Sequence, residues 1–507
     1  MRYFRHGVYW FVVGLGLTSL AAAARPRAGS ATARVERYLR SIRNQPPLLS
    51  AFFRRMPKGG DLHNHLTGAI YAETYIHWAA AAGDCVRLAD MTAVRPPCGP
   101  MDPPIRNALR QSGLYTAILH AWSMLGWNPA RESGHDHFFA TFDKYSLAHA
   151  HHFGDMIAQV AQRAARERLE YLELMDTLDG SVASHLGMQA GWTGNLAQMR
   201  RRLMRAGISH AVAAAQARLN RGEVVWQRDL GCGTPQARPG CGVTVRFLYQ
   251  VIRALPPQAV YAQFLTGFLL ARRDARVVGI NLVAPEDGYV ALHDFHLQMQ
   301  MLDYLHHRYP QVKIALHAGE LNTRLVRPRN LRFHIRQSIE LGHASRIGHG
   351  VDIMHESHPF QLLREMRRRN VLVEICLTSN WSILGIAGRN HPLPIYLRYH
   401  VPVALATDDE GVSRSDMTRQ YVRAEREFQL SYATLKQMTR DSLEHAFLPG
   451  ASLWRAPEDF HPVAACAAGV LGARHPAPAC ARYLAASPKA RLEWKLERRL
   501  RRFEARF

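Results

Sequence analysis

Short apolar runs alternate with amphipathic stretches along most of this 507-residue chain. Eight of the runs are expected to be strands, and the stretches between them carry apolar residues three and four positions apart, as helices do. The expected strands are 59–65, 169–175, 243–251, 277–283, 312–317, 345–349, 371–377 and 401–407. This alternation predicts a parallel (β/α)8 barrel, the TIM-barrel architecture of the α/β class.

Segments outside the strands divide the chain further. We expect a signal peptide at 1–24, a leader with N-terminal helices at 25–55, the barrel at 56–450 and a C-terminal extension at 451–507. An insertion is expected near 83–133, and its Pro- and Gly-rich first part, 83–106, is expected to be a loop. Residues 25–34 lack a pattern and are expected to form a mobile leader.

The end of the chain, 489–507, predicts a basic amphipathic helix. Eight Lys and Arg residues and three Glu residues surround an apolar stripe. The stripe consists of Leu492, Leu496, Leu500, Phe503 and Phe507. Such a stripe docks a helix onto its own domain or places it on an anionic surface, and amphipathicity alone leaves both interpretations open.

The N-terminus has the pattern of a secretory signal. Arg2 and Arg5 precede an apolar run at 8–20, and alanines at 21–24 offer a cleavage site. The pattern predicts an exported protein, periplasmic or extracellular. An uncleaved N-terminal anchor is the alternative.

Seven cysteines are present, so at least one is unpaired within a monomer. Local spacing in loop-like sequence suggests three disulfides, and an oxidising compartment would allow them. The suggested pairs are Cys85–Cys98, Cys232–Cys241 and Cys466–Cys480. Cys376 lies inside an apolar run and is expected to be a free, buried thiol.

The formal net charge is +23. Such a charge favours association with anionic surroundings such as polyanions or a lipid surface, although a general Arg-rich composition explains it equally well. We expect no specific nucleic-acid partner.

Two histidines at the end of the first expected strand indicate a metal site. His63 and His65 are two residues apart, so their side chains share one face of the strand. Other expected strands end at His317 and His349, and Asp408 directly follows the last one. The carboxyl ends of barrel strands meet on one rim, where active sites form. His63, His65, His317 and Asp408 make a ligand set suited to Zn²⁺.

Further polar residues on this rim have catalytic potential. Glu320 lies three residues after His317 and is suited to be a general acid. His349 is placed to hold or deprotonate an attacking water, and Asp409 to bind substrate beside Asp408. The set predicts a metal-dependent hydrolase.

The chain resembles the adenosine deaminase family of the amidohydrolase superfamily over about 56–450. The motifs that carry the resemblance are Met56-Pro-Lys58, His63-x-His65, His317-Ala-Gly-Glu320, Ile347-Gly-His349-Gly350, Leu377-Thr-Ser-Asn380 and Thr407-Asp408-Asp409. The resemblance implies a zinc-dependent barrel that hydrolyses the 6-amino group of adenosine or 2′-deoxyadenosine to give inosine or 2′-deoxyinosine and ammonia.

The resemblance also implies residue roles. His63, His65, His317 and Asp408 match the zinc ligands, and Asp408 is one of the three catalytic positions with Glu320 and His349. Glu320 matches the acid that protonates purine N1, His349 the residue at the water, and Asp409 the N7 contact.

Two further positions suggest how the sugar and the base are bound. Thr67 stands where cytosolic members carry an Asp that binds ribose, and Ala284 stands about where they carry a Gly whose amide contacts N3. We therefore expect weaker contact with the 5′-hydroxyl. His135 and His137 resemble a second metal pair but are expected to be structural.

The signal pattern and the segments 133–139 and 442–450 look most like the secreted branch, the adenosine deaminase-related growth factors. One alternative is a deaminase of adenine or another aminopurine, although that branch usually carries Asp where this chain has Gly348. Another is a secreted signalling or polyanion-binding protein on a deaminase scaffold. The oligomeric state stays open.

Overall fold

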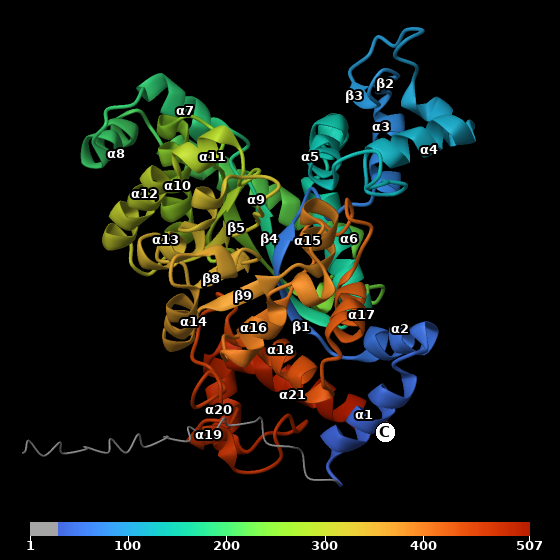
Figure 1. Cartoon of the computed structure of the whole chain (residues 1–507), viewed down its shortest axis with the longest axis vertical. Coiled ribbons are helices and arrows are strands. Elements are labelled where there is room, and N and C mark those ends of the chain that lie inside the picture. The colour runs from blue at the N-terminus through green and yellow to red at the C-terminus, as the bar shows by residue number, and fades with distance from the viewer. Residues whose placement is uncertain (1–28) are drawn as a thin grey trace, which may run out of the picture.

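The core of the molecule is a ring of eight parallel strands, shown in Figure 1. The computed structural model describes residues 29–507. The strands are β1 (Gly59–His65), β4 (Leu169–Asp176), β5 (Thr244–Ile252), β6 (Val277–Val283), β7 (Lys313–Ala318), β8 (Arg346–His349), β9 (Leu372–Ile375) and β10 (Val403–Leu405). Neighbours in the sheet follow chain order, so all eight expected strands are confirmed.

The ring closes between β10 and β1 at the residues of greatest chemical interest. The Asp408 amide donates to the His63 carbonyl at 2.9 Å, and the His65 amide donates to the Asp408 carbonyl at 3.2 Å. A parallel bridge between Asn64 and Asp408 marks the same place. The predicted (β/α)8 barrel is confirmed, and its closure sets Asp408 beside both histidines of β1.

Helices form the outer layer of the barrel (Figure 1). Within α6, for example, Met156, Ile157, Val160, Ala161 and Ala164 are buried at spacings of three and four. The helices from β1 to β10 are α3 (Ala72–Ala82), α4 (Ser112–Ala121), α5 (Gly134–Tyr145), α6 (Phe153–Arg166), α7 (Val182–Ala190), α8 (Leu196–Arg205), α9 (Ser209–Asp229), α10 (Pro257–Arg273), α11 (Tyr289–His293), α12 (Phe295–Arg308), α13 (His334–Glu340), α14 (Pro359–Arg368), α15 (Leu377–Leu384) and α16 (Leu393–Arg398).

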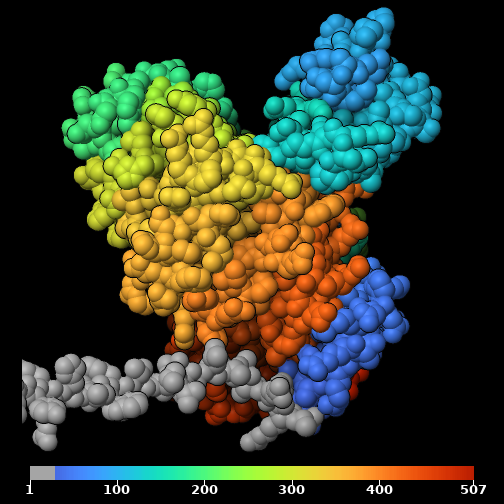
Figure 2. All heavy atoms as spheres, viewed as in Figure 1, coloured from blue at the N-terminus to red at the C-terminus, as the bar shows by residue number. Residues whose placement is uncertain are grey.

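Two groups of helices project from one end of the barrel, and the space-filling view shows a notch between them (Figure 2). One group holds α3, α4 and α5, and the other holds α7 and α8 (Figure 1). Between α3 and α4, the expectation of a plain loop is wrong, because β2 (Cys85–Arg87) and β3 (Thr92–Val94) pair as an antiparallel hairpin. Its strands have three residues each, which is too short for a clear alternating pattern.

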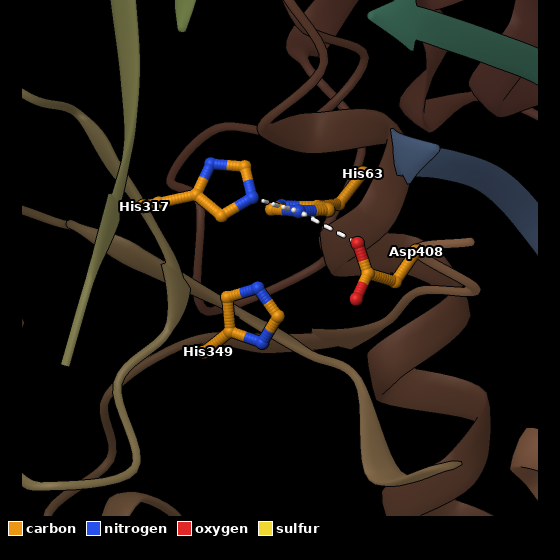
Figure 3. Close-up of side chains that lie close together, drawn as sticks. All are labelled: His63, His317, His349 and Asp408. Atoms are coloured by element: carbon orange, nitrogen blue, oxygen red, sulfur yellow. Dashed lines mark hydrogen bonds and ion pairs between the residues drawn. The ribbon is translucent and has the colours of Figure 1, made fainter. Parts of the chain in front are cut away.

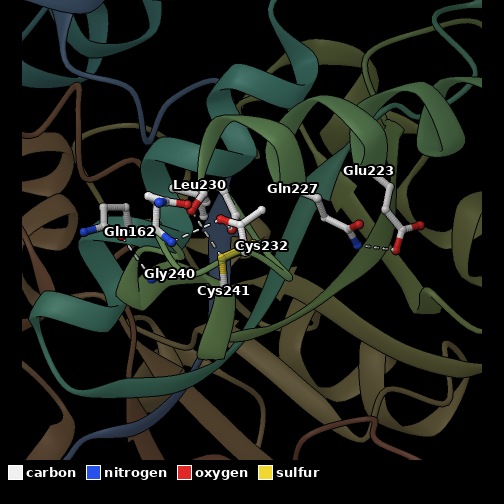
Figure 4. Close-up of a disulfide and its surroundings, with 10 residues drawn as sticks. Gln162, Glu223, Gln227, Leu230, Cys232, Gly240 and Cys241 are labelled. Atoms are coloured by element: carbon white, nitrogen blue, oxygen red, sulfur yellow. Dashed lines mark hydrogen bonds between the residues drawn. A yellow bond between two sulfur atoms is a disulfide. The ribbon is translucent and has the colours of Figure 1, made fainter.

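The three suggested disulfides are confirmed, and Cys376 is free and buried. Figure 4 shows Cys232–Cys241, which closes the loop after α9. Within that loop the Gly240 amide donates to Gln162 Oε1 of α6 at 3.0 Å. The disulfide and this hydrogen bond hold the loop against the barrel's outer layer.

The N-terminal segment is more ordered than expected. Helix α1 (Ala31–Ile42) begins after Ser30, whose hydroxyl accepts from the Ala33 amide, and α2 (Pro46–Arg55) follows. The expectation of a mobile leader is therefore wrong for residues 31–34. The expected signal at 1–24 lies outside the described residues. Within 29–507, every helix is too short or too polar to cross a membrane.

The C-terminal helices cover the end of the barrel opposite the notch (Figure 1). They follow α17 (Met417–Phe428) and are α18 (Tyr432–Glu444), α19 (Ala464–Ala467), α20 (Pro478–Ala486) and α21 (Pro488–Glu504). Leu492, Leu496 and Leu500 of α21 are buried in a cluster with Leu62 and Tyr171 of the barrel strands. This confirms docking of the apolar stripe.

Basic residues of α21 also neutralise a buried charge in the barrel. Lys495 and Arg499 lie 3.4 and 3.1 Å from the Glu170 carboxylate. Glu170 is fully buried, so its charge requires such partners. Part of the basic face of α21 therefore serves the fold.

Candidate active site

Three imidazoles and one carboxylate converge at the rim where β1, β7 and β10 end. His63 Nε2 and His65 Nε2 lie 3.0 and 3.1 Å from His317 Nε2. Both also lie 3.4 Å from Asp408 Oδ1. Figure 3 shows the side chains of His63, His317, His349 and Asp408 arranged around a common centre.

The outer nitrogen of each of the three rings is hydrogen-bonded to an oxygen. The partners are Glu374 Oε2 for His63 at 2.7 Å, Gln250 Oε1 for His65 at 2.7 Å and Asn281 Oδ1 for His317 at 2.6 Å. These oxygens accept, so each Nδ1 carries the proton, and a neutral ring then has a bare Nε2. Three bare nitrogens facing one another favour a cation between them.

The electrostatics around His63 also favour a cation at this centre. Burial opposes its protonation, yet hydrogen bonds to Asp408 and Glu374 raise the pKa of His63 to about 10. The centre thus attracts positive charge, and a bound metal cation would take the place of the proton on His63 Nε2. The donor separations of 3.0–3.4 Å also suit ligands held at about 2.0–2.1 Å from one zinc ion. The residues fit a metal ion of the zinc type.

Two side chains at this centre stand on strained backbone. His349 has φ 69° and Asp408 has φ 59°, in the left-handed region that favours glycine. Such conformations cost about 1–3 kcal/mol each and persist where the surroundings enforce them. Strain of this kind concentrates at functional sites, and here it aims both side chains at the centre.

Glu320 lies beside the centre on a loop that a second carboxylate holds in place. The Glu286 carboxylate accepts from the backbone amides of Gly319 at 3.0 Å and Glu320 at 2.9 Å, and pairs with His334. Burial, and then the negative charges of Asp408 and Glu286, raise the pKa of Glu320 well above its usual value. Glu320 is therefore suited to donate a proton.

Asp409 is buried beside Asp408, and its Oδ1 has no hydrogen-bond partner among the described residues. A Cβ atom at Gly68 would lie 1.6 Å from that oxygen, so only glycine leaves room for it. Burial, and then the charge of Asp408, raise the pKa of Asp409 well above its usual value. An unpartnered buried carboxyl of this kind is suited to bind a polar group of a ligand.

A cavity of about 490 Å³ opens over the centre. Three aromatic residues of α5 (Phe138, Phe139 and Phe142) form one wall, and Asp143 follows them. Pro285, Ile252 and Ile383 add apolar surface, and the floor carries His65, His317, Glu320, Asp408 and Asp409. No Lys or Arg of residues 29–507 lines this cavity. Its size and apolar walls suit a small organic ligand.

The family model for adenosine deaminase matches residues 129–453 of the chain, which is more than half of its length. The chain belongs to the adenosine deaminase family. This family groups deaminases that are hydrolases built on a metal-dependent barrel. The converging imidazoles and carboxylate are the group in this chain that fits such a metal.

Individual relatives agree with the family. An adenosine deaminase from Enterococcus faecalis is 28% identical over 177 residues, which are 35% of this chain and 47% of that protein. The chain spans about half the length of the curated relatives it matches. An adenine deaminase from Arthrobacter aurescens superposes with a TM-score of 0.50 and 17% identity, over 78% of this chain and 94% of that one. An Arabidopsis N6-mAMP deaminase superposes with a TM-score of 0.50 and 19% identity, over 79% of this chain and 96% of that one. The two structures support the fold alone.

All nine site residues predicted from the sequence lie together. His63 and His349 are fully buried beneath the cavity, and the other seven line it. Those seven are His65, Thr67, Ala284, His317, Glu320, Asp408 and Asp409. Ala284 has φ 89°, in the left-handed region that favours glycine.

The second histidine pair behaves differently. His135 contacts Asp136 and Asp287, both at 2.9 Å. His137 contacts Glu132 at 2.7 Å and two backbone carbonyls. The rings thus belong to separate hydrogen-bond groups at the start of α5, as expected for structural residues.

Sequence reasoning missed the residues that orient the histidines. Gln250, Asn281 and Glu374 are each a polar residue within a largely apolar strand, and such an interruption is a usable signal. It was also missed that α5 supplies a wall of the cavity, since Phe138, Phe139 and Phe142 have the spacing of an ordinary core helix.

Proposed function

We propose that this protein is an exported, zinc-dependent adenosine deaminase that converts adenosine and 2′-deoxyadenosine to inosine and 2′-deoxyinosine with release of ammonia. One observation carries the proposal. Three bare imidazole nitrogens and a carboxylate converge beneath a cavity that also presents the high-pKa carboxyl of Glu320. A nucleophile and a proton source therefore meet at one small-molecule site.

His63, His65, His317 and Asp408 would hold the zinc ion. When bound, zinc lowers the pKa of water towards about 7 and so supplies a hydroxide nucleophile at neutral pH. The protein keeps the three rings in the required tautomer through Glu374, Gln250 and Asn281.

The remaining site residues transfer protons and orient the water and the base. Glu320 donates a proton to purine N1, which makes C6 more electrophilic. His349 directs the attacking water, and Asp409 binds N7 at the opposite edge of the base. A carbon–oxygen bond forms at C6, and the bond from C6 to the amine breaks. One proton of the water goes to the amine, which leaves as ammonia. The other returns to Glu320, so the product keeps the proton on N1 and has a carbonyl at C6.

The lining of the cavity favours a nucleoside over a nucleotide. Its ionisable residues include Glu320, Asp408, Asp409 and Asp143, with no Lys or Arg among the described residues. A phosphate would be repelled, whereas the phenylalanines suit a neutral base. Asp143 can accept a hydrogen bond from a ribose hydroxyl and so substitute for the Asp that Thr67 replaces.

The direct test offers zinc-loaded protein four substrates: adenosine, 2′-deoxyadenosine, adenine and AMP. Ammonia release should be fastest for the two nucleosides, slower for adenine and slowest for AMP. The highest kcat/KM for adenine would support the alternative of an adenine deaminase, and the highest for AMP would overturn the argument from the cavity lining.

Export is part of the same proposal. The sequence at 1–24 has the signal pattern, and three disulfides suit an oxidising compartment. After secretion by a host cell, N-terminal sequencing should find a mature chain that starts near residue 25. An unprocessed chain held in the membrane fraction would instead support the anchor.

A further inference from the structure

Four histidine rings surround the centre, but one of them is hydrogen-bonded in the opposite sense. His63, His65 and His317 donate outwards from Nδ1 to oxygens. The Nδ1 of His349 instead faces the side-chain nitrogen of Asn380, Nδ2, at 3.0 Å, and Glu320 Oε1 lies farther from it, at 3.4 Å. An amide nitrogen donates, so the Nδ1 of His349 accepts and is unprotonated.

The orientation of the Asn380 amide follows from a second histidine. Asn380 Oδ1 lies 3.0 Å from His391 Nε2. His391 Nδ1 accepts from the backbone amide of Leu393 at 3.1 Å, in the first turn of α16. A backbone amide can only donate, so it fixes the polarity of the whole chain of hydrogen bonds from Leu393 to His391, Asn380 and His349.

Reversing the chain of hydrogen bonds is physically unfavourable. With the Asn380 amide turned over, its NH2 group would face His391 Nε2, which would then have to accept. His391 would need a proton on Nδ1, directly against the Leu393 amide hydrogen. A doubly protonated His391 is also disfavoured, because burial and the positive charge of Arg423 lower the pKa of His391 to about 3.

The hydrogen bonds that join these three side chains are shielded from bulk solvent. Asn380 and His349 are fully buried, and His391 is 2% exposed. His391 also packs against Phe428 of α17, with ring centroids 5.9 Å apart. Water therefore does not compete for these hydrogen bonds, and the direction of proton donation is held by the fold.

We propose that Asn380 and His391 are positioning residues that keep His349 in the tautomer with Nδ1 bare and Nε2 protonated. Nε2 is buried without a partner among the described residues, and its ring stands 5.0 Å from that of His63 and 5.2 Å from that of His317. A protonated Nε2 cannot bind a metal, so His349 serves as a hydrogen-bond donor to the attacking water. Only this last role rests on the proposed function.

Steady-state kinetics on matched variants test the positioning role. Asn380→Asp keeps the size of the side chain but replaces the donating NH2 with an acceptor, and His391→Leu removes the proton that orients Asn380. Each should lower kcat about 10- to 100-fold, with KM and bound metal near wild type. His391→Gln can still donate to Asn380 and should recover most of the loss. Asn390→Asp, the same change at an exposed position nearby, is the control.

A spectroscopic measurement tests the tautomer independently of catalysis. In protein labelled with 15N-histidine, the signals of His349 are assigned by their loss in His349→Gln. The wild type should show a bare Nδ1 and a protonated Nε2, and Asn380→Asp should reverse them.

Two results would overturn the inference. One is a protonated Nδ1 at His349 in the wild type. The other is a kinetic result, given an active wild type. Either Asn380→Asp leaves kcat unchanged, or His391→Gln and His391→Leu lower kcat equally. Wild-type protein that deaminates no purine would instead reject the proposed function, and the 15N shifts would still decide the tautomer.

Discussion

The floor and the α5 wall of the cavity are built in different ways. Floor residues stand at the ends of barrel strands, and the histidines there are hydrogen-bonded to polar side chains of neighbouring strands. The wall comes from α5, a helix in the long segment between β1 and β4, where Phe139 and Phe142 are half-buried and Asp143 is exposed. If the proposed function holds, the chemistry rests on the sheet, while substrate contacts rest on an element that can vary without disturbing it.

The largest effect should come from breaking the floor. His317→Ala removes one metal ligand together with its hydrogen bond to Asn281. We expect loss of both bound metal and detectable deamination, because His317 Nε2 lies 3.0 and 3.1 Å from the other two imidazole nitrogens and its removal opens the ligand set on that side. Metal analysis and ammonia release measure the two outcomes. A variant that keeps a full complement of metal would remove His317 from the ligand set.

The next largest effect should come from the proton donor. Glu320→Gln keeps the shape of the side chain and the metal, but an amide does not supply the proton that purine N1 requires. We expect kcat to fall about 10²–10⁴-fold, the usual contribution of a general acid. Near-normal turnover would show that Glu320 is not the acid.

A change in the wall should have a smaller and selective effect. Asp143→Asn replaces a charged acceptor with a neutral one and so weakens a hydrogen bond from a ribose hydroxyl by about 1 kcal/mol. The KM for adenosine should then rise roughly five-fold. Substrates lacking one hydroxyl identify the hydroxyl that Asp143 binds. If Asp143 binds the 5′-hydroxyl in place of the Asp that Thr67 replaces, the KM for 5′-deoxyadenosine should be insensitive to the substitution. An equal rise for both substrates would place Asp143 elsewhere on the ribose.

The smallest effect should be on stability. Ala284 has φ 89°, so Ala284→Gly relieves a left-handed alanine and should raise the free energy of unfolding by up to about 1 kcal/mol. Denaturant unfolding monitored by fluorescence measures this change. Lower stability in the variant would show that the alanine methyl contributes more through packing than it costs in strain.

Features that depend on local sequence could be predicted. The eight strands and the His63–His65 pair follow from short-range periodicity, and the barrel rule then places His317, His349 and Asp408 on the same rim. The hydrogen-bond partners could not be assigned. His63 and Glu374, for example, are 311 positions apart, and the sequence of neither strand indicates which residue the other contributes.

The wall and the short hairpin were missed for other reasons. The phenylalanines of α5 have the spacing of a core helix, and only the tertiary position of α5 turns them towards the cavity. β2 and β3 have three residues each, so their composition carries little signal. The hairpin shows only in their pairing, beside the Cys85–Cys98 disulfide.

The central claim is that one zinc ion at the floor enables this protein to deaminate adenosine. Its most direct test removes metal by chelation and then titrates zinc back while ammonia release from adenosine is followed. The account predicts activity that is lost on chelation, rises in proportion to bound zinc and saturates at one ion per chain. Full activity in the metal-free protein, or none in protein carrying one zinc per chain, would contradict it.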